Sequence, residues 1–265
     1  MGRYIHKFST AAEFRAAYEG TAYTEPWVSL TEETSEVNYN KYDPSNGHAY
    51  VDLGLPSGTL WATMNVGATS ETDYGGYFAW GETVDKFGNG ETAYTWNNYE
   101  YGSAYNKLTK YCPENMSSQW NGEGSPDNLT ELEASDDAAS VNWGGEWHMP
   151  TIGQCQELIN NTVSAWTSDY NDSGVAGVVF TAQNGNSLFI PAAGDVWDEG
   201  REDVGSWFYV WTSSLDTDSP YGAWGLNGDS EEVSVNDDGR YGGYSVRGVL
   251  GELSTNTEEP EETDE

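Results

Sequence analysis

The stretch VVFTAQNGNSLFI, residues 178–190, contains two apolar runs separated by a short polar segment. An Asn-Gly pair between such runs favours a two-residue type I′ turn, because both residue types tolerate the positive φ that this turn requires. The sequence therefore predicts a β-hairpin with Asn184 and Gly185 at its turn. Further extended segments are expected near residues 209–215, 221–226, 232–235 and 244–250.

A helix is predicted just before this hairpin. Thr151 follows Pro150 as an N-cap, and Gln154 completes the capping box three residues later. Apolar residues then recur at helical spacing and end at an Asn pair: Ile152, Cys155, Leu158, Ile159, then Asn160 and Asn161. One or two helices among short antiparallel strands and many loops predict an α+β fold.

Composition limits the function classes. The 265 residues carry 44 acids and 10 bases, a formal net charge of −34, which disfavours binding to nucleic acid or to anionic lipid. With 12 Trp, 18 Tyr and 7 Phe the chain is too aromatic to be a disordered acidic protein. No apolar run reaches the roughly 18 residues of a membrane span, so no membrane insertion is expected.

Three zones differ in composition. Residues 1–46 are predicted to form an assembly or attachment segment, with a helix over 10–20, one or two strands within 25–40 and a turn at 43–47. Residues 47–250, dense in Trp, Tyr and Gly, are the expected ligand-binding domain. Residues 251–265 are acidic and rich in Thr, Ser and Pro, and are predicted to be disordered. The first residues lack the apolar core of a signal peptide.

Common catalytic motifs are absent, including phosphate-binding and dinucleotide-binding loops, the His-Glu-x-x-His motif and the nucleophile elbow. We therefore expect no enzyme activity. A hydrogen-bonding role is expected for His148, because no second metal ligand stands at a suitable spacing. Cys112 and Cys155 are expected to be free buried thiols.

Calcium is the one cofactor that the acids suggest. The candidate ligands form two short runs, Asp216 with Asp218 and Asn236 with Asp237 and Asp238. Neither run keeps the spacing and glycine of an EF-hand loop, so solvated turn acids are the favoured interpretation and no cofactor is assigned.

Residues 225–244 differ from the rest of the domain. Small, acidic and Tyr residues alternate there with few apolar ones, which predicts that the stretch lies at the surface. Tyr, Ser, Gly and Asn are also the residues that adaptable binding surfaces use.

Several motifs in this order resemble the Fibrobacter succinogenes major paralogous domain family, which is related to C-type-lectin-like folds. The motifs are YVDLGLPSGTLWATMNVGA (50–68), DYGGYFAWGET (73–83), WGGEWHMPT (143–151), NSLFIPAAG (186–194), VWTSSL (210–215), AWGL (223–226) and SVRGV (245–249). They span nearly all of the second zone. The resemblance implies a C-type-lectin-like α+β fold.

Some members of that family are variable proteins of diversity-generating retroelements in gut Bacteroidota and their phages. There a constant scaffold alternates with surface positions whose adenine-containing codons are rewritten. Carried over to this chain, the resemblance implies these ligand-binding variable positions: Tyr209, Tyr221, Gly222, Gly225, Asn227, Asp229, Ser234, Asn236, Asp237, Asp238, Gly239, Tyr241, Gly242 and Tyr244. The implied scaffold is Trp211, Ser213, Ser214, Trp224, Leu226, Val233, Arg240, Val246 and Arg247.

The expected function is accordingly a non-enzymatic receptor-binding protein displayed on a phage virion, with a protein or glycan on a bacterial cell surface as its ligand. Residues 1–46 are a candidate for homo-oligomerisation, and the cytoplasm or a bacterial surface are alternative locations. A bacterial surface or structural module that never diversified is the second hypothesis. A carbohydrate-active enzyme is the third, because a pair of catalytic carboxylates leaves no recognisable spacing in a sequence.

Overall fold

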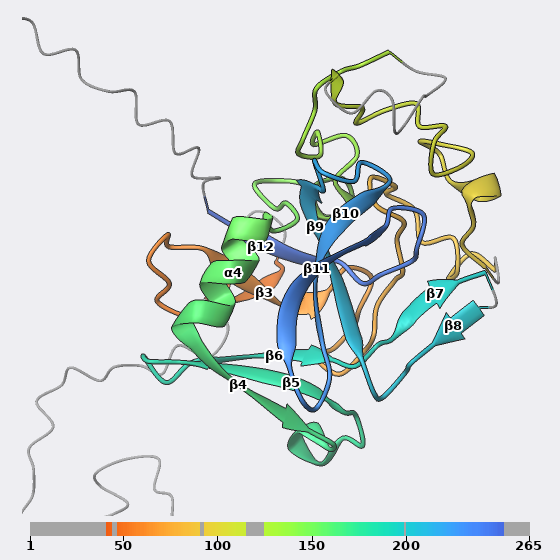
Figure 1. Cartoon of the computed structure of the whole chain (residues 1–265). Helices are drawn as coiled ribbons and strands as arrows, with labels where there is room; N and C mark the ends of the chain where they lie inside the picture. Colours follow the sequence, from red (N-terminus) through yellow and green to blue (C-terminus); the bar gives the residue numbers. More distant parts are fainter. Residues whose placement is uncertain (1–40, 44–46, 91–92, 115–124, 199, 252–265) are drawn as a thin grey trace, which may run out of the picture. The chain divides into compact units, whose positions relative to one another are not determined.

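The computed structural model describes residues 41–43, 47–90, 93–114, 125–198 and 200–251 (Figure 1). The helix expected over 10–20, the strands expected within 25–40, most of the turn at 43–47 and the tail after 251 lie outside these residues. The chain divides into two units after Glu36, and every described residue belongs to the second, Val37–Glu265.

Antiparallel sheets make up most of the regular secondary structure of the described residues. One sheet has the order β1-β2-β3-β12, formed by Lys41–Tyr42, Ala49–Asp52, Leu60–Asn65 and Arg247–Leu250. A second has the order β11-β10-β9, formed by Val233–Gly239, Gly222–Gly228 and Phe208–Leu215. A third, β4-β5-β6, comprises Thr162–Thr167, Gly177–Ala182 and Ser187–Pro191, and β7 (Asp195–Trp197) pairs with β8 (Gly200–Glu202).

The described helices are short. Two are α-helices, α3 (Ala138–Trp143) and α4 (Ile152–Asn161), and two are single 3-10 turns, η1 (Trp96–Asn98) and η3 (Tyr170–Asp172). Sheets with two α-helices confirm an α+β or mostly-β architecture. Strands β9, β10 and β11 have eight, seven and seven residues, longer than the short strands that the sequence predicted.

The predicted helix is confirmed as α4. The Oγ1 of Thr151 accepts from the Gln154 N–H at 3.2 Å, and the Gln154 side chain accepts in return from the Thr151 N–H at 2.9 Å. Cys155 and Leu158 are buried in the largest core cluster, and α4 packs against β9, β10 and β11 (Figure 1). The helix therefore supports one face of that sheet.

The predicted hairpin is confirmed as β5 and β6, but its turn is not type I′. The Gly185 N–H donates to the Ala182 carbonyl at 3.0 Å, and Gly185 has a φ of 86° whereas Asn184 has a negative φ. This is a type I turn followed by a glycine, the pattern of a three-residue hairpin loop. Asn184 is held by tertiary contact, since its Nδ2 donates to the Asp52 carbonyl at 3.0 Å.

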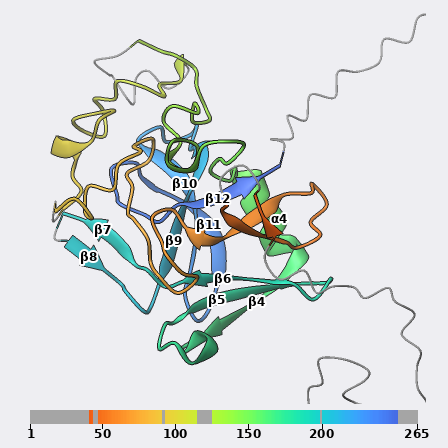
Figure 2. The same cartoon turned by 180° about the vertical axis from the view of Figure 1, so that it is seen from behind.

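Strand β12 is the last described element, and it closes the domain beside the strands that open it. It pairs with β3, as Figures 1 and 2 show, and Val249 stands opposite Trp61. The predicted segment at 244–250 is shorter as a strand because residues 244 and 245 form isolated bridges to Phe78 and Val210 instead. The bridge to Val210 brings the segment before β12 beside β9, an edge strand of the β9–β11 sheet.

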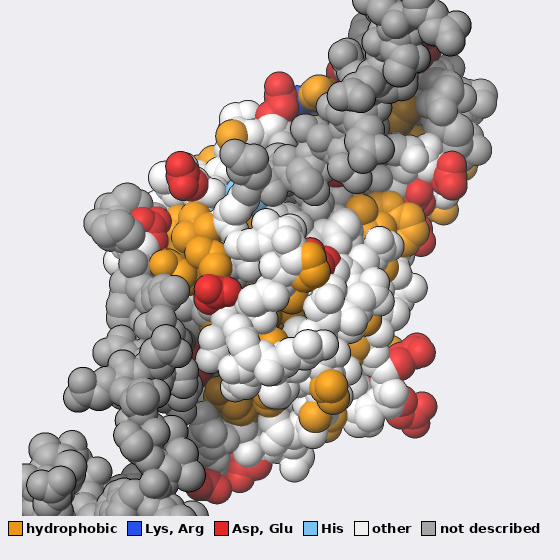
Figure 3. All heavy atoms as spheres, turned by 90° about the vertical axis from the view of Figure 1, so that its left-hand side faces the viewer, with side chains coloured by type: hydrophobic (Ala, Val, Ile, Leu, Met, Phe, Trp, Pro, Cys, Tyr) orange, Lys and Arg blue, Asp and Glu red, His pale blue; other side chains and the backbone are white. Residues whose placement is uncertain are grey.

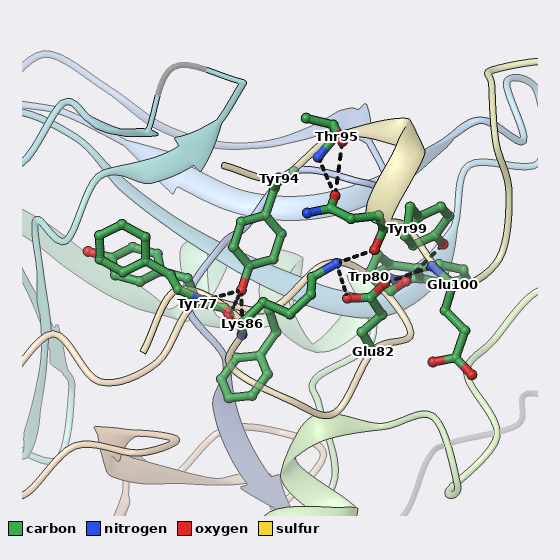
Figure 4. A network of polar contacts seen from close by, with 12 residues as sticks. Tyr77, Trp80, Glu82, Lys86, Tyr94, Thr95, Tyr99 and Glu100 are labelled. Atoms are coloured by element: carbon green, nitrogen blue, oxygen red, sulfur yellow. Dashed lines mark hydrogen bonds and ion pairs between the residues drawn. The ribbon is translucent and has the colours of Figure 1, made fainter. Parts of the chain in front are cut away.

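A polar network anchors the long connection between β3 and α3 (Figure 4). The Lys86 Nζ lies 2.6 Å from the Glu82 Oε2 and donates to the Asn98 carbonyl at 2.7 Å. The Tyr94 hydroxyl donates to the Tyr77 carbonyl and accepts from the Lys86 N–H at 3.0 Å. The Tyr94 ring, in turn, lies next to Gly243. These contacts therefore hold the connection against the segment that precedes β12.

The remaining expectations about the domain concern its thiols and its surface. Cys112 and Cys155 are free and buried, as predicted. Acidic side chains stand out on the face in Figure 3, where basic ones are scarcely visible. Within the described ranges, no helix is both long enough and apolar enough to cross a membrane.

Candidate functional site

Strands β9, β10 and β11 place alternate side chains on one face of their sheet. Asn227 of β10 stands opposite Tyr209 of β9 and Ser234 of β11, and Gly225 stands opposite Trp211 and Asn236. Directly opposed residues of antiparallel strands project to the same side. The other face, which includes Val210 and Leu226, packs into the core with α4.

A small polar network lies on the first face. The Asn236 Nδ2 donates to the Asn227 Oδ1 at 3.0 Å and to the Ser234 Oγ at 2.9 Å. The Ser234 hydroxyl also lies within hydrogen-bond distance of the Asn227 Oδ1, at 3.3 Å. Three predicted site residues are thus brought together across two strands.

The fourteen predicted site positions differ in burial. Four are exposed: Tyr221, Asn236, Asp237 and Asp238. Five are half-buried: Tyr209, Asp229, Ser234, Gly239 and Tyr241. Five are buried: Gly222, Gly225, Asn227, Gly242 and Tyr244. The expectation that residues 225–244 lie at the surface is therefore wrong for Gly225, Asn227, Gly242 and Tyr244, and the implied variable position Gly222 is buried as well.

Tyr244 is buried because its ring is a core ring. It stacks on Trp211 with centroids 4.1 Å apart, and only 1% of the residue is exposed. Its hydroxyl donates to the Asp238 Oδ2 at 2.6 Å, and burial, reinforced by Asp238, raises its pKa. Gly242 is buried for a related reason, since a Cβ there would lie 2.4 Å from the Trp197 ring. Both positions support the surface and do not form it.

A continuous row of rings crosses this face, and we call it the ring row: Trp207, Tyr209, Tyr244, Trp197 and Tyr241. Successive centroids lie 5.8, 4.8, 6.0 and 4.9 Å apart. All except Tyr244 are half-buried, so part of each remains accessible. Trp197 and Trp207 were not among the predicted site residues. Both lie in Gly-rich and acidic sequence outside residues 209–244, so the sequence did not indicate that they belong to the candidate site.

Tyr221 belongs to a separate exposed pair. Its ring meets that of Tyr105 edge to face at 6.4 Å, and the two residues are 40% and 61% exposed. The sequence also gave no indication of Tyr105, which lies more than a hundred positions earlier. The Tyr221 carbonyl accepts from the Arg240 N–H at 3.0 Å, which holds this loop to a scaffold residue.

The predicted scaffold residues are buried, except Trp224 and Val233, which are half-buried. The Trp211 Nε1 donates to the Phe78 carbonyl at 2.9 Å. Arg240 and Arg247 are both fully buried. The guanidinium of Arg247 donates to the Asn65 Oδ1 at 2.9 Å and to the Ala62 carbonyl at 3.1 Å, and burial lowers its pKa to about 9.

Carboxylates surround the ring row. Asp195 is 5% exposed, and its Oδ2 accepts from the Trp197 Nε1 at 2.5 Å. Burial raises the pKa of Asp195 to about 6; the Trp197 hydrogen bond opposes this, and the neighbouring Asp203 and Glu202 add to it. Burial also raises the pKa of Tyr209, with Asp195 as the leading charge contribution. The surface is therefore both aromatic and acidic.

The acids that suggested calcium lie close to one another at one point. Asp216 is buried, its Oδ1 accepts from the Asp218 N–H at 3.0 Å, and burial followed by the charge of Asp237 raises its pKa. No group of three or more His, Cys, Asp or Glu arranged to hold a metal occurs among the residues whose placement is described. His148 is a hydrogen-bonding residue as predicted, with Nδ1 2.9 Å from the Met149 carbonyl and Nε2 2.9 Å from the Gly251 carbonyl.

A pocket of about 360 Å³ lies elsewhere. It is lined by Val66, Gly67, Asp73, Gly75, Gly76, Phe78, Thr83, Val84, Asp85, Asn89 and Asn142, none of them a predicted site residue. Its two carboxylates are used by the loops themselves, since Asp73 accepts from the Thr69 N–H at 2.9 Å and Asp85 from the Gly88 N–H at 2.7 Å. We therefore base the candidate site on the ring row and its polar neighbours.

Comparisons of the chain with protein-family models, with curated proteins and with solved structures found no match.

Proposed function

We propose that this chain is a non-enzymatic ligand-binding protein with a C-type-lectin-like fold, which binds its partner through one face of the β9–β11 sheet and the adjoining loops. The observation that carries the proposal is the division of roles within residues 209–247. The implied scaffold positions are almost all buried, whereas Tyr221, Asn236 and Asp238 are exposed and belong to the implied variable set. No cofactor is part of the proposal.

Rigidity of the scaffold supports this function. Trp211 and Arg247 tie the chain before and after the exposed positions to backbone or side-chain acceptors in the 62–78 region. A surface held in place loses little conformational entropy on binding, so side-chain identity determines affinity. Replacement of exposed residues would then change specificity without refolding the domain.

The resemblance to variable proteins of diversity-generating retroelements extends the proposal. We propose that the exposed positions are diversified in related copies, and that the protein is displayed on a phage virion where it selects a protein or glycan on a bacterial surface. A reverse-transcriptase gene with a near-copy template beside this gene would support diversification. Their absence would favour the bacterial surface or structural module that never diversified.

A pair of libraries tests the proposal directly. One library randomises Tyr221, Asn236 and Asp238, and the matched library randomises the buried Ser213, Leu226 and Val246. Most members of the first are expected to remain folded and to yield binders to an unrelated target protein, because exposed substitutions change stability by only about 0.5 kcal/mol. Most members of the second are expected to unfold. Equal loss of folding in both libraries would contradict the proposal.

A further inference from the structure

The candidate site has a second component beside the ring row, the carboxyl group of Asp195. Asp195 and Trp197 are two residues apart on β7, so both side chains leave the same face of the strand. Trp197 contacts Tyr241 and Tyr244 on that face, and its Nε1 donates to the Asp195 Oδ2. The carboxyl group therefore lies at the edge of the Trp197 ring, next to the ring row.

One oxygen of this carboxyl group has no partner. Asp195 is 95% buried, given its 5% exposed fraction, and its Oδ1 has no hydrogen bond in the described part of the chain. A buried carboxylate with an unpaired oxygen is costly, and a nearby positive charge is the usual compensation. Oδ1 itself is covered, so a cation bound at the ring row would act on it through its charge without contacting it.

The neighbouring groups do not supply that charge. The charged residues that act most strongly on Asp195 are Asp203, Glu202 and Asp238, all of them acids. Arg201 is close in sequence but stands opposite Val196, on the other face of the β7–β8 pair, with its guanidinium 5.7 Å from the Phe87 ring. Each of these acids adds negative charge near the Asp195 carboxylate, which makes binding of a cation more favourable.

The aromatic rings of the ring row also favour binding of a cation. The faces of Trp and Tyr rings attract cations, and the attraction is larger where water is partly excluded. Asp238 is exposed beside them and holds its Oδ2 against the Tyr244 hydroxyl, with the Gly239 N–H on Oδ1 at 2.7 Å. Two carboxylates, one exposed and one buried, thus flank these partly exposed rings.

We propose that the ring row binds an arginine or lysine side chain of a partner protein, with the cation against the Trp and Tyr rings, paired with Asp238 and attracted by the buried carboxylate of Asp195. This inference rests on the proposed function and names the ligand chemistry of the same surface. A neutral sugar would stack on the rings but would leave the buried carboxylate uncompensated. A net charge of −34 further favours a basic partner.

The test uses the full chain and two blocked peptides of equal length, one of alternating Gly and Arg and one with citrulline in place of each Arg. Binding is measured by tryptophan fluorescence and calorimetry at low and at physiological salt. The Arg peptide is expected to bind at least about tenfold more tightly than the citrulline peptide, and salt is expected to weaken only the former. Asp195→Asn and Asp238→Asn are each expected to weaken binding of the Arg peptide by about fivefold or more.

Glu146→Gln is the matched control, because it removes one negative charge from an exposed residue outside the ring row. It is expected to leave the affinity unchanged, and thermal unfolding of each variant checks that it is folded. Equal affinity for the two peptides, no binding of either, or an unchanged affinity in both Asp variants would overturn the cationic ligand. Binding of neutral methyl glycosides that depends on Trp207 would also overturn it, while leaving the ligand-binding function intact; failure of the surface library would instead remove the function itself.

Discussion

At the residue scale, Asp195 makes stability depend on pH. Its pKa is about 6 in the folded protein, against an ordinary value of about 3.9 in an unfolded chain. The folded state therefore holds the proton more tightly, so the contribution of this group is greatest below about pH 4 and is lost as the pH rises through about 6. Above that pH, the buried anion destabilises the fold.

Asp195→Asn is accordingly expected to raise the free energy of unfolding by about 1–3 kcal/mol above pH 7 and to change it little below pH 4. The amide oxygen can still accept from the Trp197 Nε1–H. Urea unfolding over this pH range provides the measurement. A variant that is less stable than the parent at neutral pH would show that the carboxylate is compensated within the chain.

Two glycines among the predicted variable positions make a matched pair. A Cβ at Gly242 would lie 2.4–2.8 Å from three atoms of the Trp197 ring, whereas one at Gly225 would meet its nearest atom at 3.4 Å. Gly242→Ala is expected to cost about 1–3 kcal/mol through overpacking, and Gly225→Ala less than about 1 kcal/mol. Thermal unfolding of both variants checks this. Equal effects would mean that Trp197 can move aside freely.

At the element scale, the capping box of α4 stabilises the helix that supports the β9–β11 sheet. Thr151→Ala removes the acceptor of the Gln154 N–H and is expected to cost about 0.5–2 kcal/mol, while Thr151→Ser keeps an acceptor and most of the stability. In a domain of this size, each kcal/mol lowers the Tm by about 2–4 °C. A Ser variant as unstable as the Ala variant would assign the loss to packing of the Thr methyl group.

The hairpin of β5 and β6 shows how an element can be predicted while its turn is not. The pairing follows from two apolar strands joined by Asn and Gly, which are local properties. The turn type follows from a contact more than a hundred residues away, because Asn184 and Asn186 both donate to the Asp52 carbonyl. That contact holds the loop in its three-residue form.

At the scale of the whole molecule, the net charge of −34 opposes compactness. Added sodium chloride is therefore expected to raise the Tm, most steeply up to about 0.1 M, where the Debye length has fallen to about 10 Å. Calorimetric scans over a salt series measure the effect, with sucrose at matched osmolality as the control. A Tm independent of salt would mean that the acids are already well separated or locally compensated.

Some features of the whole molecule could be predicted from the sequence, and others could not. The helix at Thr151, the hairpin, the strands of the candidate site and the two free thiols follow from local patterns, because capping, apolar spacing and turn residues act within a few positions. The exposed Asn236 and Asp237 were foreseen for the same reason. The assignment of Tyr244 to the surface was wrong because composition does not reveal that its ring stacks on Trp211.

The sequence by itself thus determined an aromatic, strongly acidic α+β chain and the strands that carry its candidate site. Only the tertiary structure decided which of those residues are exposed. It also brought Trp197, Trp207 and the unpaired carboxyl oxygen of Asp195 to the same surface. The physical reason is that a ring row is assembled from side chains of separate strands and loops, and long-range packing, which leaves no local pattern, selects its members.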